Sequence, residues 1–317
     1  MNEQKSIDIG FSVNVEQLWL PEGIGEKRKL GKMKFGLGGS SINIHQALKA
    51  FGVKSSVLAF IANPEHLAPD DLIVRAITEQ VISNEEKRGL TITKLPVLSR
   101  DNYAIKEYET EHTYGYKGTL QDTTQVEQFL TAHRNHTDGK ICTGIQLDEI
   151  RFAKLMLRQT AESKSLNLKP SVLGNKEVLK DILPYCDFLF MNEAEYKLCK
   201  LDTNEMHKLG VSFIAITKGA NGVTWSFKGN RDWEEVQGVT VSSNEKLFTT
   251  GCGDWFHGAF RGALIRLGYD SKNLTLSQVK TAVKIANIVA AEKTKFRASS
   301  LGPDQDFVSS VISEITA

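Results

Sequence analysis

Short apolar runs alternate with longer segments of helical periodicity along most of this chain. The run from Ile7 to Val13 is predicted to be a buried strand, and the segment from Ser40 to Phe51 a helix closed by Gly52. The next apolar run, Val53 to Ile61, is predicted to be a second strand. Because two strands joined through a helix lie parallel in one sheet, the pattern indicates an α/β fold, with a mostly parallel central sheet and helices on both faces.

The alternation continues into the C-terminal half of the chain. Further strands are predicted at Ile141–Gly144, Ser165–Leu168, Phe188–Met191 and Phe213–Thr217. Helices are predicted at Asp148–Ser163, Lys176–Leu183, about Gly253–Leu267 and about Leu276–Glu292. We find no internal repeat, low-complexity tract or linker, so residues 1–317 are expected to form a single domain.

Two segments are too polar for a buried parallel sheet. Residues 17–36 are rich in Gly, Lys and Glu, and residues 103–116 alternate between polar and apolar side chains. Alternation of this kind is typical of strands with one exposed face. We therefore expect both segments to stand apart from the central sheet.

The charges of the chain nearly cancel, with 39 Lys and Arg residues against 38 Asp and Glu residues. No overall field draws such a chain to nucleic acid or to anionic membranes, so an anionic ligand needs a local site. No run of about 18 apolar residues occurs, and Met1 is followed by the polar stretch Asn2 to Lys5 instead of a signal segment. We expect a protein that is neither secreted nor membrane-spanning.

The four cysteines are separated by spacings that suit neither zinc nor a disulfide framework. They are Cys142, Cys186, Cys199 and Cys252. None has a CxxC neighbour or a histidine at metal-ligand spacing. A reducing cytoplasm fits this usage best.

Two glycine-rich segments open predicted helices: GLGGSSIN (36–43) and TTGCGDWFHG (249–258). The first amides of a helix lack partners and carry partial positive charge, so Gly251 and Gly253 are predicted to form an anion-binding turn. Two interpretations stay open for the carboxylate of Asp254. It is either a helix cap or a base that deprotonates a hydroxyl beside the anion site.

Other residues near these turns also allow two interpretations. Asn43 is either exposed to solvent or a hydroxyl-recognising amide, and Trp255 packs either in the core or against a ligand. His45 and His257 receive no role. A nicotinamide oxidoreductase has little support, because the glycines at 36–39 lie too far from the first strand for a GxGxxG fingerprint.

Five motifs follow one another over nearly the whole chain. The first motif combines Asn14 and Glu16 with Gly38, Gly39 and Asn43. The second is FLFMNEAE (188–195), which contains Asn192 and Glu195, and the third is AITKGANGVTW (215–225), which contains Thr217, Gly219 and Gly222. The fourth is TTGCGDWFHGAF (249–260), and the fifth combines Asn287 with the loop KFRASSLGP (295–303). In this order they resemble the motifs of the ribokinase-like carbohydrate kinases of the phosphofructokinase-B type.

This resemblance implies a role for each motif. The first would bind the substrate through Asn14, Glu16, Gly38, Gly39 and Asn43. The nucleotide would contact Asn192, Thr217, Gly219, Gly222, Thr250 and Asn287, and magnesium would be held through water by Glu195 and Asn192. Asp254 would be the catalytic base, with the backbone of Gly251, Cys252 and Gly253 as the anion hole.

The resemblance also implies a three-layer ribokinase-like fold with a small β lid, formed by segments of about 15–36 and 100–117. Such lids often pair two subunits, so we expect a homodimer. The implied reaction is transfer of the γ-phosphate of ATP, with Mg²⁺, to a hydroxyl of a sugar, sugar derivative or nucleoside. A catalytically silent ligand-binding or regulatory protein on the same fold is the alternative.

Several residues depart from the family pattern. Phe248 replaces an acidic residue, Cys252 replaces a common Ala, and Trp255 stands where small residues are frequent. Glu16 is one methylene longer than the usual Asp, and the loop at 295–303 lacks the Arg-X-Gly-Ala pattern, which argues against potassium (K⁺) activation. Sugar-phosphate kinases tend to carry Lys beside the paired glycines, where this chain has Ser40 and Ser41, and Lys106 and Lys117 are the main basic residues of the second lid segment. We therefore expect an unphosphorylated substrate.

Overall fold

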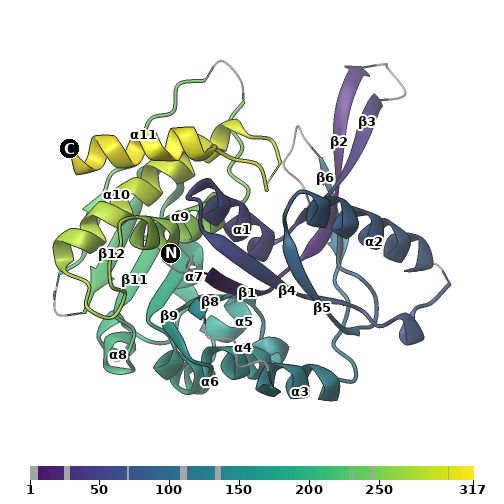
Figure 1. Cartoon of the computed structure of the whole chain (residues 1–317), viewed down its shortest axis with the longest axis horizontal. Helices are drawn as coiled ribbons and strands as arrows, with labels where there is room; N and C mark the ends of the chain where they lie inside the picture. The colour runs from purple at the N-terminus through teal and green to yellow at the C-terminus, as the bar shows by residue number, and fades with distance from the viewer. Residues whose placement is uncertain are drawn as a thin grey trace, which may run out of the picture.

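The computed structural model describes residues 6–24, 29–69, 71–107, 113–132, 137–228, 230, 232–243, 246–298 and 300–317. The polar stretch Asn2 to Lys5, residues 25–28 and 108–112 of the expected lid segments, and Ser299 of the loop at 295–303 lie outside the described residues. Figure 1 gives the arrangement of the helices and strands.

A nine-stranded sheet forms the centre of the molecule, in the order β13-β12-β11-β10-β9-β8-β1-β4-β5. Its strands are β1 (Ser6–Phe11), β4 (Lys54–Ala62), β5 (Thr91–Leu98), β8 (Thr137–Ile145), β9 (Ala161–Leu168), β10 (Phe188–Asn192), β11 (Phe213–Thr217), β12 (Val223–Phe227) and β13 (Glu234–Val236). The strands from β11 to β5 in this order pair in parallel, whereas β12 and β13 are antiparallel at one edge. The predicted α/β fold with a mostly parallel sheet is confirmed.

Alternate residues of the strands face two separate apolar cores, because successive side chains point to opposite faces of a sheet. Phe188 and Phe190 of β10 lie in one core, and Leu189 and Met191 in the other. The first core is completed by α1 (Ser40–Ala50), α2 (Asp71–Lys87), α9 (Cys252–Arg266), α10 (Leu276–Glu292) and α11 (Gln305–Thr316). The second is completed by α3 (Thr124–Ala132), α4 (Ile150–Leu157), α5 (Pro170–Leu173), α6 (Lys176–Ile182), α7 (Glu193–Leu198) and α8 (Thr203–Lys208). The three layers of helices, sheet and helices are visible in Figure 1.

One predicted helix is too long. The helix expected at Asp148–Ser163 ends at Leu157, and β9 begins at Ala161. β9 has a polar face, in which Ser165 bonds to the ring of His257 and Ser163 accepts a hydrogen bond from Arg261. The partners on α9 satisfy these buried polar groups, so the strand lacks the apolar run by which a buried strand is recognised.

A separate four-stranded sheet has the order β3-β2-β6-β7. Its strands are β2 (Asn14–Ile24), β3 (Lys29–Gly38), β6 (Tyr103–Glu107) and β7 (Thr113–Tyr116). The two polar segments of the sequence supply all four strands, and β2 and β3 project beyond the main body in Figure 1. This second sheet joins the central sheet through the residues between β1 and β2 and those between β5 and β6.

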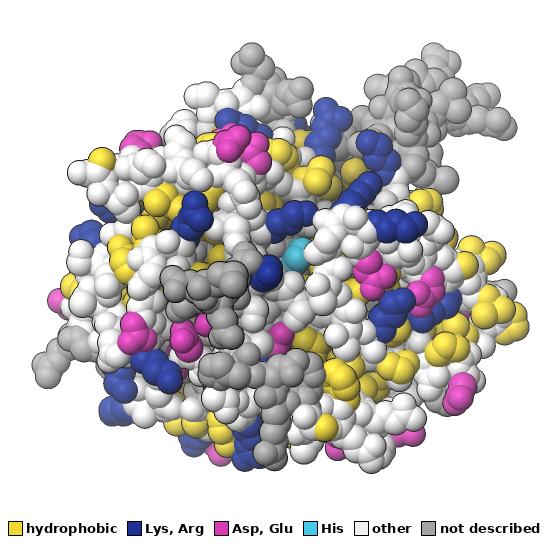
Figure 2. Space-filling view, viewed as in Figure 1, with side chains coloured by type: hydrophobic (Ala, Val, Ile, Leu, Met, Phe, Trp, Pro, Cys, Tyr) yellow, Lys and Arg dark blue, Asp and Glu magenta, His cyan; other side chains and the backbone are white. Residues whose placement is uncertain are grey.

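The helices seen in the described residues include none that combines the length and apolar character needed to span a bilayer. Figure 2 shows basic, acidic and apolar side chains interspersed over the face in view. This distribution agrees with the nearly balanced charge of the sequence.

Candidate active site

A pocket of about 550 Å³ lies between the carboxyl ends of β1, β4 and β8, the first turns of α1 and α9, and the second sheet. The side chains and backbone that line it include Ser12, Asn14, Glu16, Gly39, Ser40, Asn43, Asn102, Lys106, Lys117, Gly144, Gln146, Glu149, Lys169, Thr250, Gly251 and Asp254. Ligands of open parallel sheets bind at this edge, because the loops that follow the strands gather there. Six residues predicted from the sequence as substrate or catalytic residues therefore meet in one cavity: Asn14, Glu16, Gly39, Asn43, Gly251 and Asp254.

Asp254 occupies the first turn of α9, and its Oδ2 accepts a 2.8 Å hydrogen bond from Nδ2 of Asn43. The N-cap of this helix is Gly251, and no side-chain hydrogen bond caps it. Capping therefore does not account for the carboxylate. Burial raises the pKa of Asp254, while the hydrogen bond from Asn43, the charge of Lys169 and a hydrogen bond from Ser40 lower it.

The turn before α9 leaves two amides open toward the pocket side. Gly251 adopts a left-handed conformation with φ of 84°, which favours glycine. The amide of Cys252 donates to the carbonyl of Thr249 at 3.2 Å, whereas in the described chain the amides of Gly251 and Gly253 have no hydrogen-bond partner. Of the three residues predicted as the anion hole, only these two thus have free donors at a helix N-terminus.

Two amide side chains present unsatisfied oxygens to the pocket. Oδ1 of Asn14 and Oδ1 of Asn43 are buried and have no hydrogen-bond partner among the described residues. Glycine at position 39 allows α1 to start close to Ser12 and Asn14. Its φ is 91°, and a Cβ there would lie 2.5 Å from the carbonyl oxygen of Ser12 and 2.9 Å from Oδ1 of Asn14. Buried acceptors without donors cost free energy unless a ligand or water supplies the hydrogen.

Glu16 and Lys106 form an ion pair within the second sheet. Nζ of Lys106, on β6, donates to Oε1 of Glu16, on β2, at 2.6 Å. Glu16 is 8% exposed, and a Cβ on Gly38 would lie only 1.9 Å from its Oε1. Glycine at position 38 therefore makes room for the longer acid that stands in place of the usual Asp.

A second ion pair lines the same pocket. Nζ of Lys117 donates to Oε1 of Glu149 at 2.7 Å, and the other oxygen of Glu149 accepts from the backbone amide of Gln146 at 2.9 Å. The sequence motifs contained neither Gln146 nor Glu149. These residues follow β8, so their place at the carboxyl edge of the sheet was the available signal.

Lys169 is a further pocket residue that the sequence analysis missed. It follows β9 directly, and its positive charge lowers the pKa of both Asp254 and Glu195. In the part of the chain that the structure describes, its ammonium makes no side-chain hydrogen bond or ion pair. A lysine in this position can meet an anionic group close to Asp254.

Asn192 and Glu195 lie at the end of β10 and the start of α7, next to the pocket. They form a capping box, in which Asn192 Oδ1 accepts from the amide of Glu195 at 2.8 Å and Glu195 Oε2 accepts from the amide of Asn192 at 2.9 Å. Burial raises the pKa of Glu195, and the charge of Asp254 raises it further. A largely buried carboxylate that a nearby carboxylate repels is suited to a divalent cation, so Glu195 and Asn192 fit magnesium held through water.

The remaining predicted nucleotide residues continue this edge of the sheet away from the pocket. Thr217 ends β11, and its Oγ1 would be 3.9 Å from a Cβ on Gly253, so β11 adjoins the start of α9. Gly222 has φ of 87°, and a Cβ there would lie 2.1 Å from the carbonyl oxygen of Val236. Asn287 of α10 donates to the carbonyl of Gln237, at 2.8 Å, in the chain that follows β13. Gly219 lies in the short turn between β11 and β12.

Two of the departures from the family pattern point away from the pocket. Trp255 is 1% exposed and packs on Gly302, where a Cβ would lie 2.4 Å from its ring. Phe248 is also buried, and its amide donates to the carbonyl of Thr294 at 2.7 Å. Neither lines the cavity. Of the two interpretations of Trp255, core packing is the one the structure supports.

His45 and His257, which received no role, both lie outside the pocket. Nε2 of His257 is 2.7 Å from Ser165 Oγ, the ring stacks on Phe190, and burial lowers its pKa well below the usual value. His45 contacts Ser55 at 2.8 Å, and burial lowers its pKa to about 4. Both rings are neutral at physiological pH and serve packing.

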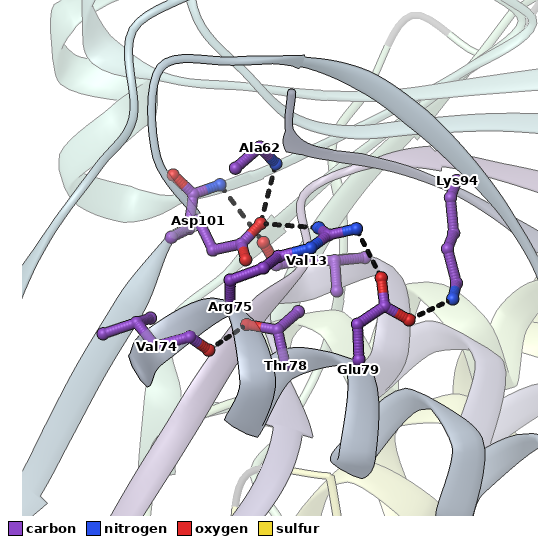
Figure 3. Close-up of polar contacts among 9 residues, drawn as sticks. Val13, Ala62, Val74, Arg75, Thr78, Glu79, Lys94 and Asp101 are labelled. Carbon is purple, nitrogen blue, oxygen red and sulfur yellow. Dashed lines mark hydrogen bonds and ion pairs between the residues drawn. The ribbon is translucent and has the colours of Figure 1, made fainter. Parts of the chain in front are cut away.

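A polar network holds the chain where it enters the second sheet (Figure 3). Asp101 accepts hydrogen bonds from the amide of Ala62 at 2.7 Å and from Arg75 of α2 at 3.3 Å. The next residue, Asn102, donates from Nδ2 to the carbonyl of Val13 at 3.2 Å and accepts at Oδ1 from the amide of Gly118 at 2.9 Å. The side chain of Asn102 thus bonds to the segment before β2 and to the segment after β7.

Comparison with known proteins identifies relatives of this architecture. A family model described as pfkB family carbohydrate kinase matches residues 9–301. No match was found among curated protein sequences.

Solved structures agree over nearly the full length. Ribokinase from Thermotoga maritima has a TM-score of 0.68 at 17% identity and covers 98% of this chain and 99% of its own. The Burkholderia thailandensis nucleoside kinase in complex with inosine has a TM-score of 0.70 at 16% identity, with 98% of both chains covered. Phosphofructokinase-2 from Escherichia coli in complex with potassium has a TM-score of 0.67 at 12% identity, with 99% of both covered. At these identities the structures establish the ribokinase-like fold.

Proposed function

Because this chain belongs to the pfkB family of carbohydrate kinases, we propose that it transfers the γ-phosphate of ATP to a hydroxyl of a sugar, sugar derivative or nucleoside, with Asp254 as the general base. The chain is a sugar or nucleoside kinase. The observation that carries the specific mechanism is the position of Asp254, hydrogen-bonded to Asn43 and next to the free amides of Gly251 and Gly253.

The acceptor hydroxyl would approach Asp254, which takes its proton as the oxygen attacks the phosphorus. Burial raises the pKa of this carboxyl, so it holds a proton better than an ordinary Asp. Asn43 keeps the carboxylate oriented through its 2.8 Å hydrogen bond. Oδ1 of Asn14 and of Asn43 would accept hydrogen bonds from other hydroxyls of the substrate.

Charge on the transferred phosphoryl group would be met from the other side of the pocket. The amides of Gly251 and Gly253 and the ammonium of Lys169 are the donors suited to it. A bound magnesium ion would neutralise phosphate charge, with Glu195 and Asn192 holding its waters. Thr217, Gly219, Gly222, Thr250 and Asn287 are proposed for the nucleotide, since they extend along the edge that starts beside Gly253.

A silent binding protein on the same fold is the second candidate. Its motivation was the unusual Glu16, Phe248 and Trp255. Phe248 and Trp255 pack into the core and leave the cavity unaltered, and Glu16 is accommodated by Gly38 and paired with Lys106. These contacts favour the active kinase. K⁺ activation is not part of the proposal, because the loop at 295–303 departs from the pattern of relatives that use it.

The second sheet is proposed as a lid that also pairs two copies of the chain. Its outer face carries three exposed apolar side chains, Phe35, Ile105 and Tyr114. They form a row across the strands, because Gln17 pairs with Phe35 on one side and with Ile105 on the other, and Ile105 pairs with Tyr114. An exposed apolar row on a small sheet suits a second copy. A cytoplasmic location is proposed as well, since all four cysteines are free.

The mechanism is tested by Asp254→Asn, which keeps the shape of the side chain and removes the base. We expect kcat to fall by about 10²–10⁴-fold in an ADP-release assay with an acceptor found by screening sugars and nucleosides. Binding of that acceptor, measured by calorimetry, should change little. Near-full turnover by the variant would refute Asp254 as the base, and release of no ADP by the wild-type protein with any bound acceptor would favour the silent binder.

A further inference from the structure

The basic side chains on the lid side of the pocket occur in pairs with acids. Lys106 is paired with Glu16, and Lys117 with Glu149, at 2.6 Å and 2.7 Å. Resting on the proposed function, we propose that the Glu16–Lys106 pair is a specificity determinant: Glu16 engages the ammonium of Lys106 at the pocket wall, and the pair restricts the acceptor to uncharged, polyhydroxylated molecules.

The position of Glu16 supports this role. Its carboxylate occupies the space that a side chain at position 38 would take, and Lys106 is held against it from the neighbouring strand. Both residues belong to the face of the second sheet that lines the pocket. The ammonium of Lys106 therefore lines the pocket as one half of an ion pair at a largely buried site, and its charge still helps to lower the pKa of Asp254.

An anionic acceptor would meet two obstacles in this pocket. Its phosphate or carboxylate would lose water on entry, and the lid-side lysines that line the described part of the pocket, Lys106 and Lys117, are already bonded to Glu16 and Glu149. Lys169 is the remaining lysine of the cavity, and it lies where Asp254 and Glu195 sense its charge. That position suits the phosphoryl group being transferred and leaves the far end of the acceptor without a charge partner.

A neutral acceptor finds the groups it needs. The buried oxygens of Asn14 and Asn43 lack donors, and Asp254 accepts in its ionised form. Hydroxyl groups can donate to all three of these residues, whereas a phosphate dianion can donate to none. The pocket thus matches a molecule rich in hydroxyls and without charge.

Two substitutions test the proposal because they break the same pair with opposite charge. Glu16→Gln removes the negative charge beside Lys106, and Lys106→Met removes the positive charge beside Glu16. If losing the pair only damaged the structure, the ratio of affinities for neutral and anionic acceptors would change in the same direction in both variants. If the pair selects acceptors by charge, this ratio changes in opposite directions in the two variants.

The probes are matched neutral and anionic molecules: fructose with fructose 6-phosphate, ribose with ribose 5-phosphate, and inosine with inosine 5′-monophosphate. Calorimetry measures the affinity for each probe, and ADP release measures turnover. We expect the wild-type protein to bind the neutral member of at least one pair tenfold or more tightly, Glu16→Gln to shift that ratio about tenfold toward the anionic member, and Lys106→Met to shift it the other way.

Glu205→Gln is the matched control. It makes the same charge change on α8, breaks the surface ion pair with Lys176 of α6, and keeps a side chain able to complete the capping box with Asp202. Its ratio should equal that of the wild type. The proposal is overturned if the wild type prefers the anionic member, if no neutral probe binds, or if the two pocket variants shift together. Binding preferences as expected without ADP release would refute the kinase mechanism and leave the role of the pair in specificity standing.

Discussion

Two opposing effects act on the proton of Asp254. Loss of water around the carboxyl favours its neutral form and raises the pKa, while the amide of Asn43 and the ammonium of Lys169 favour the anion. A base must be ionised to accept a proton, so the proposed activity rises with pH through this pKa. Asn43 therefore sets the lower pH limit of catalysis as well as the orientation of the base.

Asn43→Ala should move the acid limb of the kcat profile to higher pH. The variant loses the hydrogen bond that stabilises the carboxylate, so the pKa of Asp254 rises further. The measurement is kcat against pH at saturating acceptor and ATP. Asn84→Ala, on the exposed face of α2, is the control with an unchanged profile. An unshifted acid limb in Asn43→Ala would contradict the assigned contact.

At the level of elements, the first turn of α1 depends on a glycine. Gly39 combines a positive φ with a close approach to the backbone of Ser12, which brings Asn43 and Asn14 to the same wall. Any side chain at position 39 would push α1 away from β1. Both the geometry of the pocket and the stability of the fold therefore depend on glycine at position 39.

Gly39→Ala is expected to lower the free energy of unfolding by about 3 kcal/mol, from left-handed strain plus the collision with Ser12. Urea denaturation measures the loss. Gly268→Ala provides the comparison, because its φ of 68° is similar and no heavy atom lies within 4 Å of the added Cβ. It should cost about 1 kcal/mol, from strain alone. An equal loss of unfolding free energy in the two variants would show that the contact with Ser12 does not contribute to stability.

The elements that the sequence predicted best are the strands buried on both faces. Phe188–Met191 and Phe213–Thr217 are continuous apolar runs and match β10 and β11 within one residue. β9 was only half found, because Ser163 and Ser165 are polar and depend on His257 and Arg261 from a helix far along the chain. Local periodicity holds no information about such distant partners.

Site residues divide in the same way. The glycine turns could be predicted because their backbone conformations need particular residues, as at Gly39 and Gly251. The pairing of Glu16 with Lys106 depends on the register of β2 against β6, where Leu18 is opposite Lys106, and no spacing rule along one chain supplies that register. Lys169 needed only the observation that residues following parallel strands meet at one edge.

On the scale of the whole molecule, the second sheet presents two different faces. One face lines the pocket with Glu16, Ala104 and Lys106, and the other exposes Phe35 and Ile105. A strand register that alternates in this way allows one small sheet to cover a substrate and to meet another copy. In the proposed dimer, closure of the pocket and association of the two copies would be linked through the same four strands.

Ile105→Lys tests the proposed dimer. Ile105 is 37% exposed in the centre of the outer row, so a lysine there would place two charges in the interface of a symmetric dimer. Sedimentation velocity should show a dimer for the wild type and at least a tenfold weaker association for the variant. Leu276→Lys, an exposed apolar residue at the start of α10, should leave association unchanged. A monomeric wild type would rule out the dimer.

Asn102 has a mechanical consequence for this sheet. Its amide side chain binds Val13 before β2 and Gly118 after β7, and its carbonyl accepts from Val15 at 3.0 Å. The chain that enters the sheet and the chain that leaves it are thus fastened at one point. A tilt of the sheet over a substrate that keeps these three hydrogen bonds would turn about Asn102.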